Sequence, residues 1–347
     1  MDAPLALAPA LVARARNRTL ELCTIDTCPI ATSYYFYRVS LAANAVFLVL
    51  FSISLISFIC TFALTRRAFA FHVAMISGVI LEVLGYVGRI MSWHDQWNEN
   101  GFLMQIVCLT IAPAFLAGGI YLCLRRIVYA FGPENSRIKP ESYTRIFIPC
   151  DLASLLLQAA GGGIASAASH QNTNPVVGND IMIVGLSVQV FTLLIFIILC
   201  LDFARRTYMR YKTLGDAAFD QNPAFAKLRE GWRFKAFLIA LALATICIFW
   251  RSVYRVAELS EGWTGSLIRK QWLFLGFEGV MVIVACLSLN VFNPALTFKE
   301  GMAGLGGIGS KKKMAKQEME AQRAEETEPE AVRSEKGVSG DTSDQAS

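Results

Sequence analysis

Residues 39–65 read VSLAANAVFLVLFSISLISFICTFALT, a run without a single charged side chain between Arg38 and Arg66. A helix needs about 20 consecutive apolar residues to cross the hydrocarbon core of a membrane. Two further stretches of similar length are also free of charge. The three uncharged runs predict membrane-spanning helices at about 39–64, 101–124 and 181–203.

Four more hydrophobic stretches contain a few ionisable residues and extend the count to seven spans. Across the 347 residues, 54% are apolar and 17% are charged, against roughly 25% charged residues in an average soluble domain. The sequence therefore predicts an all-α integral membrane protein that folds as a seven-transmembrane-helix bundle. The four additional spans are expected at about 70–91, 146–168, 236–257 and 271–292.

The positions of the basic residues predict the orientation of the bundle, because cytoplasmic connections collect Lys and Arg. Of the 32 basic residues, 23 lie in the tail and in the connections on its side, 6 lie on the opposite side, and 3 lie inside spans. We therefore expect the N-terminus outside the cell and the C-terminus in the cytosol. The predicted layout is an extracellular segment over 1–38, a membrane domain over 39–298 and a cytosolic tail over 299–347.

Both terminal segments contain residues that predict their location or their state. Asn17 begins an Asn-Arg-Thr sequon, which predicts N-glycosylation on the outer side. Cys23 and Cys28 face the same oxidising space and form either a short disulfide or two free thiols. The tail is rich in Glu, Lys, Ala and Ser, so it is predicted to be disordered. Its basic cluster over 311–313 either contacts anionic lipid or is a solvated flank.

Several classes of function are not expected. The net charge of +5 is small, so we expect no nucleic-acid partner. Three histidines placed at helix ends or in loops do not predict a metal site. The sequence contains neither a Gly-rich phosphate loop nor the setting of a Ser or Cys nucleophile. We therefore expect no cofactor and no enzymatic activity.

Polar residues inside the spans are the candidate functional residues, because an ionisable group at that depth is costly unless it is paired or faces water. Glu82 and Arg89 are seven residues apart and share a helix face, and spacings of four and three place three residues of the sixth span in one stripe. The candidates for substrate binding or translocation are Glu82, Arg89, Asp151, Gln158, Gln189, Arg251, Arg255, Glu258 and Glu278.

Three positive and three negative groups inside the spans predict mutual pairing. We expect Arg89 to pair with Glu82 or with an acid of another span, and Asp151 to pair with Arg125 or Arg126. The charges then serve either to hold the helices together or to line a polar cavity open to the outer leaflet or the exterior, and their number favours the cavity. The run Gly161–Gly163 allows tight helix packing or close approach of a ligand.

Seven short motifs occur in order along the chain: Ser40–Asn44, Glu82–Arg89, Ala112–Pro113 with Tyr121, Asp151 with Gln158 and the glycines, Gly185–Leu186 with Gln189, Arg251–Arg255 with Glu258, and Gly262. Together they resemble the fungal seven-span lipid-translocating exporter family, which includes aminocholesterol-resistance and sphingoid-base-resistance proteins. The resemblance covers about residues 34–296. The chain departs from the pattern at Arg38, where the family usually has Pro, at Gln271, where Glu is common, and at Leu275, where Tyr is usual.

The resemblance implies a multi-pass protein whose partners are membrane lipids or amphiphilic small molecules. Under this hypothesis an exporter or flippase moves sphingoid long-chain bases or sterol-like amines and contributes to lipid homeostasis or resistance to toxic compounds. A cationic head would then lie among Glu82, Glu278 and Gln189. The alternative is a lipid-sensing receptor that signals through its cytosolic loops. The resemblance favours the plasma membrane over an endomembrane or the vacuole.

Overall fold

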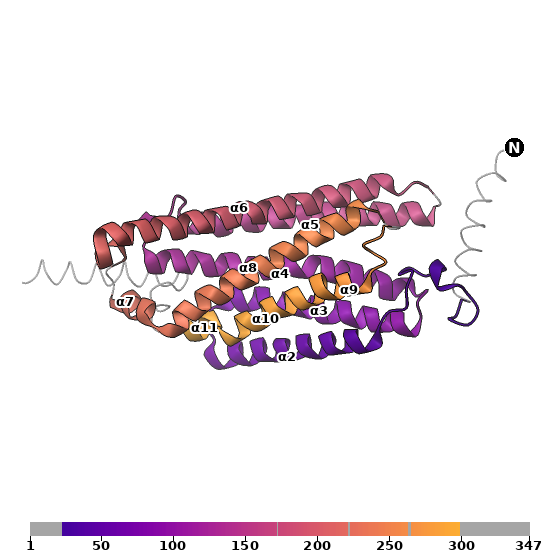
Figure 1. Cartoon of the computed structure of the whole chain (residues 1–347), viewed down its shortest axis with the longest axis horizontal. Coiled ribbons are helices and arrows are strands. Elements are labelled where there is room, and N and C mark those ends of the chain that lie inside the picture. The colour runs from indigo at the N-terminus through magenta and orange to yellow at the C-terminus, as the bar shows by residue number, and fades with distance from the viewer. Residues whose placement is uncertain (1–22, 172, 221–222, 263–264, 299–347) are drawn as a thin grey trace, which may run out of the picture. The chain divides into compact units, whose positions relative to one another are not determined.

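The computed structural model describes residues 23–298, except for 172, 221–222 and 263–264. In this part of the chain every regular element is helical, and seven helices are long and apolar enough to cross a membrane (Figure 1). The predicted number of spans is therefore confirmed. Asn17, the tail over 299–347 and its basic cluster over 311–313 lie outside the described residues.

Six spans are single helices and the seventh is composite. The single helices are α2 (Leu41–Thr65), α3 (Phe69–His94), α4 (Glu99–Phe131), α5 (Pro140–His170), α6 (Val176–Leu214) and α8 (Trp232–Ser260). The seventh consists of α9 (Gln271–Phe274), the π-helical η4 (Leu275–Val280), α10 (Met281–Val291) and α11 (Pro294–Thr297). The short element η1 (Ile30–Thr32) precedes the first span, and three others lie in connections between spans: η2 (Pro133–Asn135), η3 (Gly215–Ala218) and α7 (Pro223–Glu230).

Local sequence explains where several helices begin and end. Ser40 and Asn98 precede α2 and α4, and their side chains accept hydrogen bonds from backbone N–H groups of the first turn. Gly132 and Gly215 follow α4 and α6 with positive φ angles of 105° and 60°. Both helices extend past the ends expected at 124 and 203. Basic residues that the sequence alone assigned to loops therefore lie on helical extensions.

Neighbours in sequence pack as neighbours in space, as expected for short connections. The strongest pairings join α3 to α4, α5 to α6 and α2 to α3, while α10 packs against both α8 and α2. α4 also contacts α5 and α8 and has the largest buried share of its spanning window, 56%, against 22% for α2. α4 is thus the core helix, and α2 is the span most exposed at the surface.

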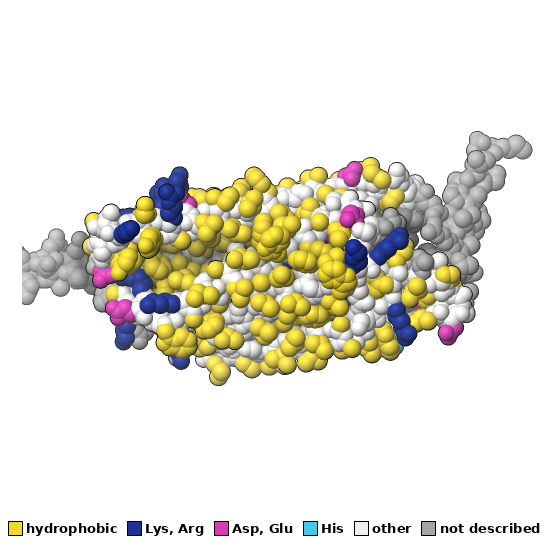
Figure 2. All heavy atoms as spheres, viewed as in Figure 1, with side chains coloured by type: hydrophobic (Ala, Val, Ile, Leu, Met, Phe, Trp, Pro, Cys, Tyr) yellow, Lys and Arg dark blue, Asp and Glu magenta, His cyan; other side chains and the backbone are white. Residues whose placement is uncertain are grey.

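The surface of the bundle has the distribution of side chains expected of a membrane protein. Figure 2 shows hydrophobic side chains covering the middle of one face, with Lys, Arg, Asp and Glu gathered toward the two ends. Large apolar residues such as Ile56, Leu156 and Ile239 are at least 61% exposed. In lipid these side chains need no protein cover, so the pattern agrees with seven membrane spans.

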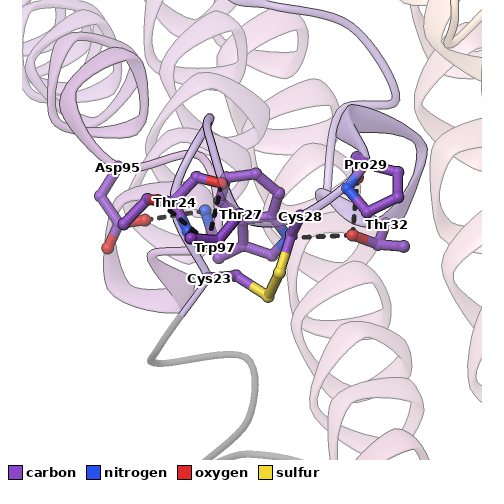
Figure 3. Close-up of a disulfide and its surroundings, with 8 residues drawn as sticks. All are labelled: Cys23, Thr24, Thr27, Cys28, Pro29, Thr32, Asp95 and Trp97. Carbon is purple, nitrogen blue, oxygen red and sulfur yellow. Dashed lines mark hydrogen bonds between the residues drawn. A yellow bond between two sulfur atoms is a disulfide. The ribbon is translucent and has the colours of Figure 1, made fainter.

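The segment before α2 is attached to the ends of the bundle helices. Cys23 and Cys28 form a disulfide with a Cα separation of 5.4 Å (Figure 3). The indole N–H of Trp97 donates to Thr32 Oγ1 at 3.2 Å, which connects this segment to the turn between α3 and α4. Tyr35 reaches further in, since its hydroxyl bonds Ser92 Oγ at 2.9 Å and Gln105 Oε1 at 2.7 Å.

Candidate functional site

The most deeply buried ion pair joins α8 to the seventh span. Arg251 Nη2 lies 2.5 Å from Glu278 Oε1, and neither side chain has any exposed surface. The same nitrogen also donates to the backbone carbonyl of Leu109 in α4. This pairing of Arg251 and Glu278 agrees with the prediction that the intramembrane charges neutralise one another.

Arg255 extends the pair into a small network one turn further along α8. Its Nη1 lies 2.6 Å from Glu258 Oε2, its Nη2 donates to Thr110 Oγ1 at 3.1 Å, and its Nε lies 3.8 Å from Glu278 Oε2. Spacings of four and three residues place Arg251, Arg255 and Glu258 on one face of α8, as the sequence predicts. Glu278 therefore interacts with two arginines.

The backbone that holds Glu278 is unusual. Glu278 lies in η4, where six residues follow the i to i+5 pattern of a π-helix. Such segments are rare and are frequently found at functional sites. The neighbouring Gly279 packs so closely on Phe47 that an added Cβ would lie 2.6 Å from its ring, so α2 approaches the backbone of η4 at this point.

Glu82 has none of the contacts that the other intramembrane acids make. Its side chain has no exposed surface, and neither carboxyl oxygen has a hydrogen-bond partner among the described residues. Glu278, Arg251 and Arg255 are the charged groups close enough to influence it. Glu82 therefore lies beside the ion-paired network without being bonded to it.

The predicted pairing of Arg89 with an acid is wrong. Its Nε donates to Asn44 Oδ1 at 2.8 Å and its Nη2 donates to Tyr37 Oη at 3.2 Å. The guanidinium also lies 3.9 Å from the centroid of the Phe274 ring. Glu82 is seven residues away on α3, so two helical turns of about 5.4 Å each separate the two groups. Neutral oxygens and an aromatic face hold this buried cation instead.

The expected partners of Asp151 are also wrong. Asp151 is 4% exposed and accepts a hydrogen bond from Tyr121 Oη at 2.8 Å, rather than pairing with Arg125 or Arg126. Tyr121 is buried in α4 between Phe147 and Phe196. The contact joins α4 to α5 through a neutral donor, because Tyr121 faces this interface while the arginines are one turn further along the helix.

Gln158 and Gln189 meet between α5 and α6. The amide nitrogen of Gln158 donates to Gln189 Oε1 at 3.0 Å, and both side chains are buried. The helices approach closely nearby, since a Cβ on Gly161 would lie 2.5 Å from the Met182 nitrogen, whereas nothing lies within 4 Å of one on Gly163. Gly161 therefore allows α5 and α6 to pack closely. The bonded contacts of Gln189 do not bring it together with Glu82 or Glu278.

A small cavity lies near the outer end of the bundle as the orientation is predicted. Its volume is about 50 Å³, and its polar lining includes Arg89, Arg255 and Glu258. Aromatic residues Tyr35, Tyr37 and Phe274 also contribute to its wall. The polar cavity expected in this half was to accommodate an amphiphile. This cavity is large enough only for a few water molecules, so it does not confirm that expectation.

A larger groove, which the sequence did not reveal, lies toward the opposite end. It has a volume of about 470 Å³ and lies between α4, α6 and α8. Leu201 and Tyr208 at its edge are 65% and 62% exposed, so the groove opens at the surface of the bundle. The lining is almost entirely apolar and includes Ile127, Phe131, Phe196, Phe203, Leu241 and Thr245.

The comparison with known proteins decides the family. Residues 75–301 match the family model described as RTA1 like protein. This chain belongs to the RTA1-like family. The match confirms the resemblance drawn from the seven motifs, and it covers all six spans from α3 onward in whole or in part.

Three relatives of this RTA1-like protein come from Saccharomyces cerevisiae. Sphingoid long-chain base transporter RSB1 is 35% identical over 256 residues, which cover 68% of this chain and 67% of the relative. Protoporphyrin uptake protein 1 is 28% identical over 229 residues, covering 66% and 70%. Protein RTM1 is 27% identical over 223 residues, covering 64% and 67%. The first two are named as transport proteins, and none of the three is named as an enzyme.

No solved structure matches this RTA1-like protein. Among the described residues, no three His, Cys, Asp or Glu side chains gather in a way that could hold a metal ion.

Tyr35 is buried at the end of the bundle where α3 ends and α4 begins in this RTA1-like protein. Burial raises the pKa of Tyr35 to about 12, and the nearby charge of Arg89 partly opposes that effect. The hydroxyl thus stays protonated across the physiological range and continues to bond Gln105.

Proposed function

We propose that this RTA1-like protein moves single lipid-like amphiphiles across the membrane, and that sphingoid long-chain bases or sterol-like amines form its substrate class. The relative named sphingoid long-chain base transporter supports the substrate class. The observation that carries the proposal is the apolar groove between α4, α6 and α8. Its volume of about 470 Å³ is within the range of small-molecule sites, roughly 300 to 1,000 Å³.

The groove suits a hydrocarbon chain. Its lining runs along α4 from Ile120 to Phe131, which corresponds to about 16 Å at roughly 1.5 Å per residue. The exposed edge at Leu201 and Tyr208 gives a chain access from the side, so a tail enters without crossing a polar surface. A tail that enters from lipid exchanges one apolar environment for another, so only CH₂ groups that come from water gain about 0.8 kcal/mol each.

The polar head requires a different environment. The network of Arg251, Arg255, Glu258 and Glu278 provides charge and hydrogen-bonding groups deep in the bundle. In our proposal the tail stays in the groove or in lipid while helix motion brings the head past this network. In this proposal the protein lies in the plasma membrane, as the family resemblance suggests. The asymmetry of its basic residues places the N-terminus outside the cell and the C-terminal tail in the cytosol.

Reconstitution into liposomes tests this function. Purified protein should move a fluorescent sphingoid base between leaflets, and Ala204→Trp should slow that movement several-fold because the indole fills the groove. Ile198→Trp, a substitution on the same helix outside the lining, should leave the rate near that of the wild type. Absence of movement by the wild-type protein contradicts the proposal. Binding of the base without movement supports the alternative, a lipid-sensing receptor.

A further inference from the structure

The buried charges beside η4 do not balance. Three acids, Glu82, Glu258 and Glu278, interact with two arginines, Arg251 and Arg255. Each arginine has one acid within 2.6 Å, which leaves Glu82 as the acid without a cation of its own. Arg89 does not supply the missing charge, because its bonds go to Asn44 and Tyr37.

The surroundings of Glu82 contain little that would stabilise a negative charge on its carboxyl group. Tyr86 approaches from its own helix, Cys108 from α4 and Cys286 from α10, and all three are neutral groups. Glu278 approaches from η4 with a charge of the same sign. α2 has no charged residue and contributes Phe47 and Phe51, which stack on Tyr86.

Among the described residues that influence Glu82, only the two arginines of α8 are positive, and both already pair with other acids. An uncompensated carboxylate in a low-dielectric interior takes up a proton rather than remain charged. The geometry therefore favours a neutral Glu82 in this conformation.

We propose that Glu82 is a proton-binding site that exchanges its proton for the cationic head of an amphiphile. This inference rests on the proposed function. In the exchange the O–H bond of the Glu82 carboxyl breaks, its electron pair stays on the carboxylate, and the proton leaves to water. The ammonium head then pairs with the carboxylate, so the net charge of the cluster is unchanged. Proton movement in one direction thereby drives cation movement in the other.

Two features of the fold support such an exchange. The cavity of about 50 Å³ is lined by Arg255 and Glu258, and Arg255 lies 3.8 Å from Glu278, so there is room for a few water molecules at one end of the network. Glu278 also lies in the π-helical η4, whose irregular hydrogen bonding gives α10 a place to shift against its neighbours α8 and α2. Such a shift would open Glu82 to the head without breaking a regular helix.

A single-chain trimethylammonium amphiphile is the decisive probe, because its head is charged at every pH and cannot carry a proton itself. In a weakly buffered solution containing a pH indicator, wild-type protein should release about one proton for each probe molecule bound. Glu82→Gln should release none. Glu261→Gln, which changes an exposed carboxylate beyond the end of α8, should behave as the wild type. An uncharged single-chain alcohol should release no protons from any variant.

Transport under a pH gradient, combined with the proton-release result, separates this inference from the proposed function. In liposomes, a pH gradient should change the rate of probe movement several-fold for the wild type, and Glu82→Gln should remove that dependence. If the wild type moves the probe at a rate independent of the gradient and binds it without releasing protons, proton exchange is overturned while translocation stands. If it moves no probe in any gradient, translocation itself fails.

Infrared spectroscopy tests the protonation of Glu82 without any transport. The C=O band of a buried protonated carboxyl group should be present at neutral pH in the wild type and in Glu261→Gln, and lost in Glu82→Gln. Because Gln replaces a neutral acid of the same shape, Glu82→Gln should also unfold at the wild-type temperature. A marked drop in that temperature, together with the absence of the band in the wild type, would show that Glu82 is ionised and overturn the proposal.

Discussion

Arg251 of α8 and Glu278 of η4 are 27 residues apart in sequence, yet their side chains meet at 2.5 Å with no exposed surface on either. The contact lies in the interface between α8 and the last span. The packing of α10 on α8 forms another part of the same interface. A charge pair at this depth holds two helices in one register, because each partner is costly without the other.

Glu278→Gln should destabilise the bundle, because it leaves Arg251 buried without its acid. Removing one partner of a buried pair typically costs about 3 to 5 kcal/mol. The double variant Arg251→Gln, Glu278→Gln should recover part of that loss, since no charge remains unpaired there. Thermal unfolding in detergent of the two single variants and the double variant gives the coupling free energy. Additive losses would show that the contact is energetically unimportant.

Arg89→Lys should impair the protein although it conserves the charge. Lysine cannot bond Asn44 and Tyr37 with two separate nitrogens while stacking on Phe274. We expect a loss of roughly 1.5 to 3 kcal/mol, the range for a hydrogen bond to a charged group. Asn44→Ala should produce a loss of similar size through the same contact. Equal unfolding temperatures for Arg89→Lys and the wild type would mean that the charge alone suffices.

Substitutions in the run Gly161–Gly163 should have opposite effects at its two ends. Gly161→Ala places a Cβ 2.5 Å from the Met182 backbone nitrogen, so α5 and α6 must separate, at a typical cost of about 1 to 3 kcal/mol. Gly163→Ala meets nothing within 4 Å and should be neutral or slightly stabilising, since Ala favours a helix over Gly by up to ~1 kcal/mol. The unfolding temperatures of Gly161→Ala, Gly163→Ala and the wild type measure both effects. Similar losses at the two positions would argue against close packing as the role of Gly161.

Alkaline pH should destabilise the bundle through Tyr35. Burial raises its pKa from 10 to about 12, so the folded state holds the phenolic proton more tightly than the unfolded state. The resulting stability is complete below pH 10 and disappears as the pH rises toward 12. Two pKa units correspond to about 2 to 3 kcal/mol. The wild type should lose that much more stability than Tyr35→Phe between pH 9 and 12, and parallel curves for the two proteins would contradict the assignment.

The predicted orientation has a direct test at the two ends of the chain. Asn17 should be glycosylated, so glycosidase treatment should shift the mobility of the wild-type protein and leave Asn17→Gln unchanged. An epitope added after Ser347 should be accessible to antibody only after permeabilisation, because 23 of the 32 basic residues lie on that side. Labelling of that epitope on intact cells would reverse the orientation.

Much of the candidate site was predictable from residue type and depth. An arginine or glutamate in an otherwise apolar span is expensive, so the sequence identifies Arg251, Arg255, Glu258 and Glu278 as residues that must pair or face water. Helical spacing then places the first three on one face. The partners of Arg89 and Asp151 were not predictable in this way, because the sequence offers charged candidates while the fold supplies Asn44 and Tyr121 instead.

The sequence by itself determined that this is a seven-span helical membrane protein of the RTA1-like family, because span number depends on the lengths of apolar runs and the family on motifs read in order. Tertiary structure alone decided which polar groups meet. The isolation of Glu82, the π-helical turn at Glu278 and the groove between α4, α6 and α8 arise from how separate helices rotate and approach one another. Periodicity assigns a residue to a face of its own helix, but it does not say which neighbour that face will touch.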